Sequence, residues 1–138
     1  MSIGIYLLLS CALDKNALRQ ESEEKRLLQE SAEKHWNGVR WSIPEKAVVF
    51  YEDPLERARK EYDFDLPVRR VTDVKILHVE LLPIENGWRD GVVYVRIEGI
   101  SSSNILTTVE QEQLWYRNET GWWIGSRATE SQLEEKKE

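Results

Sequence analysis

Two histidines are the side chains of this chain best suited to acid–base chemistry near neutral pH. His78 follows Asp73 by five residues, and a regular strand would point these two side chains to opposite faces of a sheet. On such a strand His78 shares its face with Ile76 and Glu80 instead. His35 lies on a predicted helix, where a histidine is usually at the core edge or in solvent. The spacing therefore predicts no His–Asp dyad and no catalytic residue.

Carboxylates recur on the predicted strands, but their pattern favours a solvated surface. Glu110 and Glu112 share one strand face, as do Arg96 and Glu98, which predicts cross-strand ion pairs. Two histidines and one cysteine without ligand spacing predict no metal site, and the sequence has no phosphate- or dinucleotide-binding loop. The formal net charge of −6 gives no basic footprint for a nucleic acid. We therefore expect no cofactor, no metal and no nucleic-acid partner.

Cys11 is the single cysteine and ends a short apolar run near the N-terminus. A secretory signal combines a basic segment, an apolar stretch and small residues; the first is missing here, which suggests a true start further upstream. Leu8-Leu9-Ser10-Cys11 resembles the lipobox of bacterial lipoproteins, whose cysteine is acylated. The resemblance implies a signal-like segment over 1–11 and a lipid on Cys11. Residues 12–26 are then a polar spacer or the start of the first helix; the alternative is a helical first turn that buries Cys11.

Six tryptophans in 138 residues are the most unusual feature of the composition. Trp36 and Trp115 fall on apolar faces and are expected in the core. Trp122 and Trp123 are adjacent on a predicted strand, so they point to opposite faces, and Trp88 sits in a polar turn. Trp88, Trp122 and Trp123 are therefore candidate contacts for a partner or ligand. The alternative is that a curved sheet packs these rings over its own neighbours.

Helical periodicity predicts the elements that precede the strands and carry Trp36. Leu28, Ala32, Trp36 and Val39 share one helical face, and the pair Asn37-Gly38 is expected to end that helix. Ser42 and Pro44 signal a second helix, with Ser42 as its cap, that extends to Tyr51. Asp53 and Pro54 begin a third helix, whose residues Leu55, Ala58 and Tyr62 face the same way.

Alternating apolar residues predict strands over the rest of the domain, at 71–82, 92–100, 105–117 and 122–125. Turn residues separate them, including Asn86-Gly87 and the segment 118–121. Helices followed by an antiparallel meander predict an α+β fold, with N-terminal helices packed on a curved antiparallel sheet of three to four strands. We expect a single domain over 27–126 and a charged C-terminal tail over 127–138.

Two segments carry a resemblance to a known family. Residues 36–47, WNGVRWSIPEKA, resemble the helix-break-helix of nuclear transport factor 2-like (cystatin-like) domains. Residues 113–123, QLWYRNETGWW, resemble their closing hairpin. The resemblance covers about residues 27–126 and implies a cone-like fold. Enzymes of that superfamily work inside the cone with a buried carboxylate or a His–Asp pair.

These observations lead to an expected function. The chain is expected to be a non-enzymatic lipoprotein of the bacterial envelope, anchored to the membrane through Cys11 with its domain in the periplasm. It would bind or scaffold an envelope protein. The alternative is a small-molecule-binding protein or enzyme that uses the cavity of the cone, and a further alternative is a cytoplasmic domain with an ordinary N-terminus. A buried ionisable group in a cavity would favour the enzyme, and an exposed apolar patch would favour the scaffold.

Overall fold

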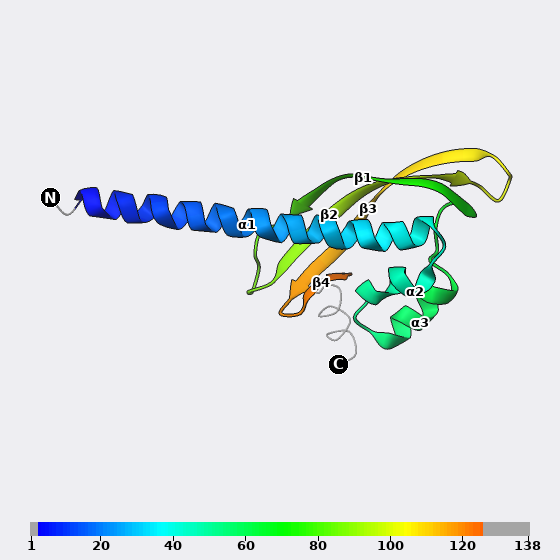
Figure 1. Cartoon of the computed structure of the whole chain (residues 1–138), viewed down its shortest axis with the longest axis horizontal. Helices are drawn as coiled ribbons and strands as arrows, with labels where there is room; N and C mark the ends of the chain where they lie inside the picture. The colour runs from blue at the N-terminus through cyan, green and yellow to red at the C-terminus, as the bar shows by residue number, and fades with distance from the viewer. Residues whose placement is uncertain (1–2, 126–138) are drawn as a thin grey trace.

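A computed structural model describes residues 3–125 of the chain, with side chains from Lys15 onward (Figure 1). The predicted charged tail over 127–138 lies outside these residues. A long helix comes first, then a short helical region, then an antiparallel meander. The elements are α1 (Ile3–Arg40), α2 (Pro44–Ala47), the 3-10 helix η1 (Val48–Phe50), α3 (Pro54–Tyr62), β1 (Arg70–Leu81), β2 (Arg89–Ile100), β3 (Leu106–Asn118) and β4 (Gly121–Ile124).

The strands of residues 3–125 form one antiparallel sheet in the order β1-β2-β3-β4, with α1 packed across one face of it (Figure 1). This confirms the predicted α+β class. Asn86 and Gly87, both at positive φ, turn the chain between β1 and β2, and a two-residue turn joins Asn118 to Gly121. Short hairpin turns keep consecutive strands adjacent, so chain order and sheet order are the same.

The predicted apolar stripe of α1 is the part of the helix that the sheet buries. Leu28, Ala32, Trp36 and Val39 are all buried against β-strand residues of the core. Gly91 of β2 lies under this stripe, where a Cβ would come within 2.5 Å of the Leu28 side chain. The close approach explains why a residue without a side chain occupies that position.

The expected helix end at Asn37-Gly38 is wrong, because α1 continues to Arg40. Gly38 is a contact point instead. A Cβ there would lie 2.9 Å from the backbone nitrogen of Ala47, and the Gly38 carbonyl accepts a hydrogen bond from Ile43 N at 2.9 Å. The missing side chain lets α2 approach α1 closely. Ser42 does not cap α2, whose N-cap residue is Ile43.

The other end of the α1–sheet contact is a cluster of charges. The Glu24 carboxylate is almost buried and lies 2.9 Å from Arg89 Nε and 2.8 Å from Arg117 Nη1. Arg89 also reaches Glu21 and donates to the Leu82 carbonyl. The contacts of α1 with the sheet thus begin before Leu28. Residues 15–23 are exposed, and α1 extends well past the sheet on this side (Figure 1).

Helix α3 begins as predicted, and its apolar residues face solvent. Asp53 caps it, since its Oδ1 accepts a hydrogen bond from Leu55 N at 3.0 Å. No residue of α3 is buried, and Leu55 and Tyr62 are 80 % and 94 % exposed. Leu55, Ala58 and Tyr62, which were predicted to face the same way, are all exposed. Their stripe points outward, and the charged side of α3 faces the protein.

Strand β1 departs from regular pairing at two places. Its register against β2 shifts between Val71 and Asp73 and again between Ile76 and His78. Ile76 is opposite Val95, whereas His78 is opposite Tyr94. Because neighbouring residues of β2 point to opposite faces, the second bulge moves His78 to the face away from α1. The prediction that His78 shares a face with Ile76 is therefore wrong.

Candidate functional site

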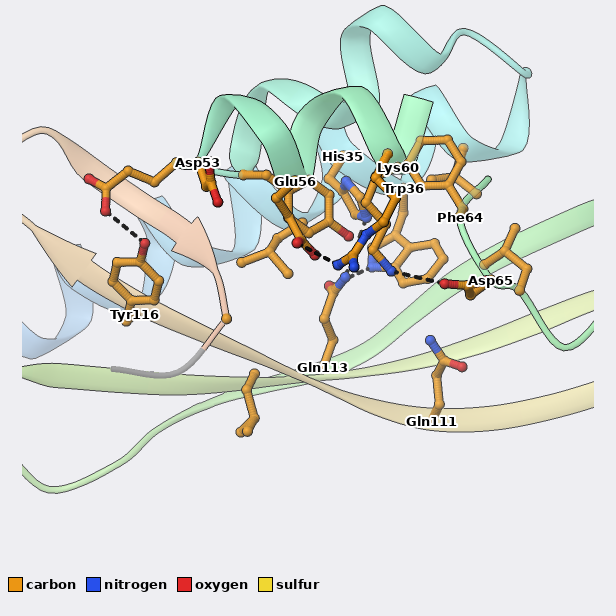
Figure 2. A pocket seen from close by; sticks show the side chains of 18 of the residues that line it. His35, Trp36, Asp53, Glu56, Lys60, Phe64, Asp65, Gln111, Gln113 and Tyr116 are labelled. Atoms are coloured by element: carbon orange, nitrogen blue, oxygen red, sulfur yellow. Dashed lines mark hydrogen bonds and ion pairs between the residues drawn. The ribbon is translucent and has the colours of Figure 1, made fainter. Parts of the chain in front are cut away.

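A pocket of about 800 Å³ opens between α3 and the last part of β3 (Figure 2). One wall comes from the charged side of α3, with Glu56, Arg59 and Lys60. The opposite wall is a run of β3 residues from Gln111 to Leu114. The inner end is aromatic and is formed by His35 and Trp36 of α1 together with Tyr51 and Phe64. The volume is in the range that small ligands or a few side chains of a partner occupy.

The inner end is held by hydrogen bonds that converge on the Gln113 side chain. Trp36 Nε1 donates to Gln113 Oε1 at 3.0 Å, and Trp115 Nε1 donates to the same oxygen at 2.8 Å. Indole N–H groups only donate, so Oε1 must be the acceptor and the Gln113 nitrogen faces His35. That nitrogen lies 3.3 Å from His35 Nε2.

These contacts fix the tautomer of His35. Gln113 can only donate to Nε2, so Nε2 is the unprotonated ring nitrogen. Nδ1 then carries the proton and donates to the Ala47 carbonyl at 2.8 Å. The ring is 2 % exposed and surrounded edge-on by Trp36, Phe50, Tyr51, Phe64 and Trp115. His35 thus ties α1 to α2 and, through Gln113, to β3.

Burial lowers the pKa of His35 to about 4, against 6.5 in water. The Ala47 carbonyl opposes this shift, and the positive charge of Lys60 adds to it. Burial similarly raises the pKa of the Tyr51 hydroxyl to about 12, with Glu56 and Asp65 contributing. Both groups are neutral at neutral pH. Since both nitrogens of His35 are already hydrogen-bonded, the ring is placed for structure rather than for proton transfer.

Most charges at the pocket mouth are engaged with one another (Figure 2). Glu56 pairs with Arg59 at 2.5 Å, and Lys60 lies 3.6 Å from Asp65. The Glu52 carboxylate accepts hydrogen bonds from Tyr116 at 2.8 Å and from Asn118 at 2.6 Å. Asp53, as described, caps α3.

Glu112 differs from these acids. It is exposed at the pocket and lies opposite Tyr94 on β2, with which it interacts electrostatically, but within residues 15–125 its carboxylate forms no ion pair and no side-chain hydrogen bond. An exposed carboxylate at the margin of the pocket suits a ligand that carries a positive charge.

The tryptophans selected as contact candidates do not form this site. Trp122 is 5 % exposed, and its Nε1 donates to the Glu24 carbonyl at 3.2 Å, so it belongs to the core. Trp123 is half-buried on the opposite face, with Nε1 2.8 Å from Asn118 Oδ1. Trp88 is 44 % exposed in the β1–β2 turn, where it exchanges backbone hydrogen bonds with Glu85. None of the three rings lines the pocket.

The outer face of the sheet carries the predicted polar contacts. Arg96 pairs with Glu110 on the neighbouring strand at 2.8 Å, which confirms the prediction of cross-strand ion pairs. His78 stacks on Tyr94 with ring centroids 4.1 Å apart, and Asp73 pairs with Arg40 at 2.9 Å. Asp73 and His78 therefore do not form a dyad. Among the residues that the structure describes, no group of three or more His, Cys, Asp or Glu side chains comes together to hold a metal ion.

Cys11, the candidate lipid attachment residue, belongs to helix α1. The structure describes its backbone but not its side chain. No helix among the described residues is both long and apolar enough to span a bilayer. The proposal of a lipid at Cys11 therefore depends on the sequence alone.

Sequence reasoning missed the pocket and its hydrogen-bond network. His35 and Gln113 are distant in sequence and carry no motif, and only the packing of α1 on β3 brings them together. The one available signal was the pair of tryptophans expected in the core, because each buried indole N–H needs an acceptor nearby. No protein-family model, no curated protein and no solved structure matches this chain.

Proposed function

We propose that this protein is a non-enzymatic binding module whose binding site is the pocket between α3 and β3. The observation that carries the proposal is the pocket itself, open on one side and closed at its inner end by the His35–Gln113 network. A rigid inner wall suits recognition, because the groups that contact a ligand are already in place.

The polar groups of the pocket favour binding over catalysis. His35 has both ring nitrogens engaged, and Glu56 and Asp65 are paired with basic residues of α3. A general base has to be within reach of a substrate proton with a free lone pair, and Glu112, the pocket carboxylate without such contacts in residues 15–125, is exposed on the outer face of β3, away from the inner end of the pocket. A small-molecule ligand is the second candidate, favoured by the pocket volume of about 800 Å³.

The proposed location is the bacterial envelope, with the domain in the periplasm and a lipid on Cys11 as anchor. The support is the lipobox-like segment Leu8-Leu9-Ser10-Cys11 and the continuous helix that joins it to the domain. At about 1.5 Å per residue, α1 would hold Glu24 about 20 Å from Cys11. The nuclear transport factor 2-like resemblance is likewise a proposal, supported by helices over one face of an antiparallel sheet.

A photo-crosslinking experiment tests the binding site. The chain is expressed in a bacterial host with p-benzoylphenylalanine at Gln111, inside the pocket, or at Leu55, on the outward side of α3. We expect an adduct on irradiation for position 111 and none for position 55. A protein-sized adduct supports the envelope-partner form, and an adduct of small-molecule mass supports the second candidate. Equal labelling at both positions, or none at 111, would overturn the proposal.

Intact-mass spectrometry of the chain from membranes of its own host tests the anchor. We expect a chain that begins at Cys11 and carries lipid. An unmodified Cys11 with residues 1–10 still attached would contradict it.

A further inference from the structure

Strand β4 covers only part of β3. It pairs with β3 from Trp115 to Asn118, whereas β2 pairs with β3 along the whole strand. Within residues 3–125, no strand lies on the other edge of β3 from Leu106 to Gln113. This stretch, which we call the open edge, therefore has backbone groups along one side that no strand within residues 3–125 pairs with.

The pairing that does exist shows which backbone groups point outward. The Leu114 carbonyl accepts a hydrogen bond from Gly125 N at 2.8 Å, so the backbone groups of Leu114 point toward β4. Alternate residues of a strand direct their N–H and C=O groups to the same edge. Glu112, Glu110 and Thr108 therefore direct theirs to the open edge, and Gln111 and Val109 direct theirs to β2.

The pocket runs along this open edge. Gln111 and Gln113 point toward α3 in Figure 2, whereas Glu112 and Leu114 belong to the opposite face of β3. All four side chains line the pocket. Side chains from both faces of one strand can line the same hollow only where it opens at the edge of that strand.

We propose that the open edge binds an extended polypeptide segment of a partner protein, which adds a strand to the sheet in line with β4. This inference rests on the proposed function and states what binds at the pocket. An extended backbone is the ligand whose N–H and C=O groups alternate with the spacing that Glu112, Glu110 and Thr108 present. Alternate side chains of the added strand enter the pocket beside Gln111 and Gln113.

Charge defines the partner further. Among the pocket carboxylates of residues 15–125, Glu112 is the one with neither an ion pair nor a side-chain hydrogen bond, and it lies on the outer face of the sheet. Side chains directly opposite one another on paired strands are close enough to interact. The segment therefore places Lys or Arg opposite Glu112, and apolar residues at the alternate positions toward Tyr51 and Phe64.

Amide hydrogen exchange on the full chain tests this pairing. The probe is a seven-residue peptide, acetyl-Val-Lys-Val-Lys-Val-Lys-Val-amide. We expect it to slow exchange at Glu112, Glu110 and Thr108 and to leave Gln111 and Val109, which already pair with β2, unchanged. Uniform protection along β3, or none, would overturn the inference.

Two modified peptides provide a matched control. Methyl groups on the Lys backbone nitrogens remove the donors that face β3 and should abolish binding. The same groups on the Val nitrogens point away from β3 and should be tolerated. Equal binding by both peptides would show that the attraction is only electrostatic and would contradict strand addition.

Two variants with the same change in net charge test the role of Glu112. Glu112→Lys should weaken the peptide by up to about fivefold, as for a cross-strand charge pair. Glu98→Lys, on β2 away from the open edge, should bind as the unmodified protein does. Equal loss in both variants would overturn the assignment of Glu112.

The remaining outcomes separate the inference from the proposed function. A crosslink from position 111 without alternating protection of β3 would refute strand addition and leave the binding site in place. Alternating protection that rises with protein concentration in the absence of peptide would identify a second copy of this chain as the occupant, and would overturn the proposal of a partner segment.

Discussion

Helices α1 and α3 both carry an apolar stripe, and the sheet buries only one of them. Leu28 of α1 is fully buried, whereas Leu55 of α3 is 80 % exposed. The difference follows from the polar groups that fix each helix. His35 and Glu24 bind α1 to the strands at two places, whereas α3 is held by its cap and by Arg57, which donates to the Tyr51 carbonyl at 2.6 Å.

The comparison shows that a helical stripe identifies a helix but does not determine what the stripe faces. Polar groups at the ends of a packed surface select the orientation, because a buried group without a partner is costly. In α1 the stripe and the polar partners lie on one side. In α3 the charged residues Glu56, Arg59 and Lys60 face the pocket, and the stripe is left outside. Four measurements test whether α1 and α3 differ in this way.

The largest effect on stability is expected for Trp115, whose ring is buried in the core. Trp115→Ala should destabilise the fold by about 3–5 kcal/mol, because the change leaves a cavity and removes a donor to Gln113. Chemical denaturation measures this directly. Trp88→Ala is the control and should cost far less, since Trp88 is 44 % exposed. Equal losses would mean that the core does not centre on Trp115.

Acid should weaken the α1 attachment through His35. Its pKa is about 4 in the folded protein and 6.5 in water, so between these values the unfolded chain binds the proton and the folded chain does not. Stability is therefore complete above pH 6.5 and falls as the pH drops, by about 3 kcal/mol near pH 4.

The matched measurement uses His35→Gln, which removes this titration. Free energies of unfolding between pH 6.5 and about 5 should fall in the original protein and remain nearly flat in the variant, since ordinary carboxylates titrate mainly below this window. The same slope in both proteins would show that His35 is not the group responsible.

The charged end of the α1–sheet contact should contribute less. Glu24→Gln removes the carboxylate between Arg89 and Arg117 and should cost about 1–3 kcal/mol, reduced from the fully buried case because Arg117 is partly exposed. Thermal unfolding gives the value. Glu23→Gln, which breaks an exposed pair with Arg26, is expected to leave the midpoint unchanged. A midpoint lowered equally by both changes would argue against a special role for Glu24.

The smallest effect is expected on α3. Leu55→Ala should alter stability by less than about 0.5 kcal/mol, because no core surrounds this side chain. Leu28→Ala, the same change on α1, should cost about 2–5 kcal/mol. Denaturant titrations of the two variants compare them. Similar costs would show that the stripe of α3 packs against something after all.

Much of the fold could be predicted because it depends on local patterns. The period of α1 placed Leu28 and Trp36 in the core, and the turn at Asn118 joined the last two strands as expected. The failures depend on contacts between distant residues. In the sequence, Gly38 has the pattern of a helix end. Only its close contact with Ala47 explains why a glycine occupies this position within the helix.

The candidate site was harder to predict for the same reason. Trp122 and Trp123 were correctly expected on opposite faces, but which one is buried depends on where α1 crosses the sheet. A bulge before His78 places its side chain on the other face of the sheet, and no glycine or proline in β1 indicates this bulge in the sequence. The network around Gln113 joins α1 and β3, so no local window of sequence contains it.

The irregular course of β1 has a consequence for stoichiometry. Its two register shifts interrupt the even spacing of backbone groups that an incoming strand would need, and the Arg40 guanidinium donates to the Thr72 carbonyl at the first shift. Strand addition at the proposed open edge would therefore extend the sheet beyond β3 only. An added strand would end the series, because the two register shifts and the Arg40 contact leave β1, in the described residues, without an equally regular edge. Recognition by strand addition would then give a closed one-to-one complex rather than a fibre.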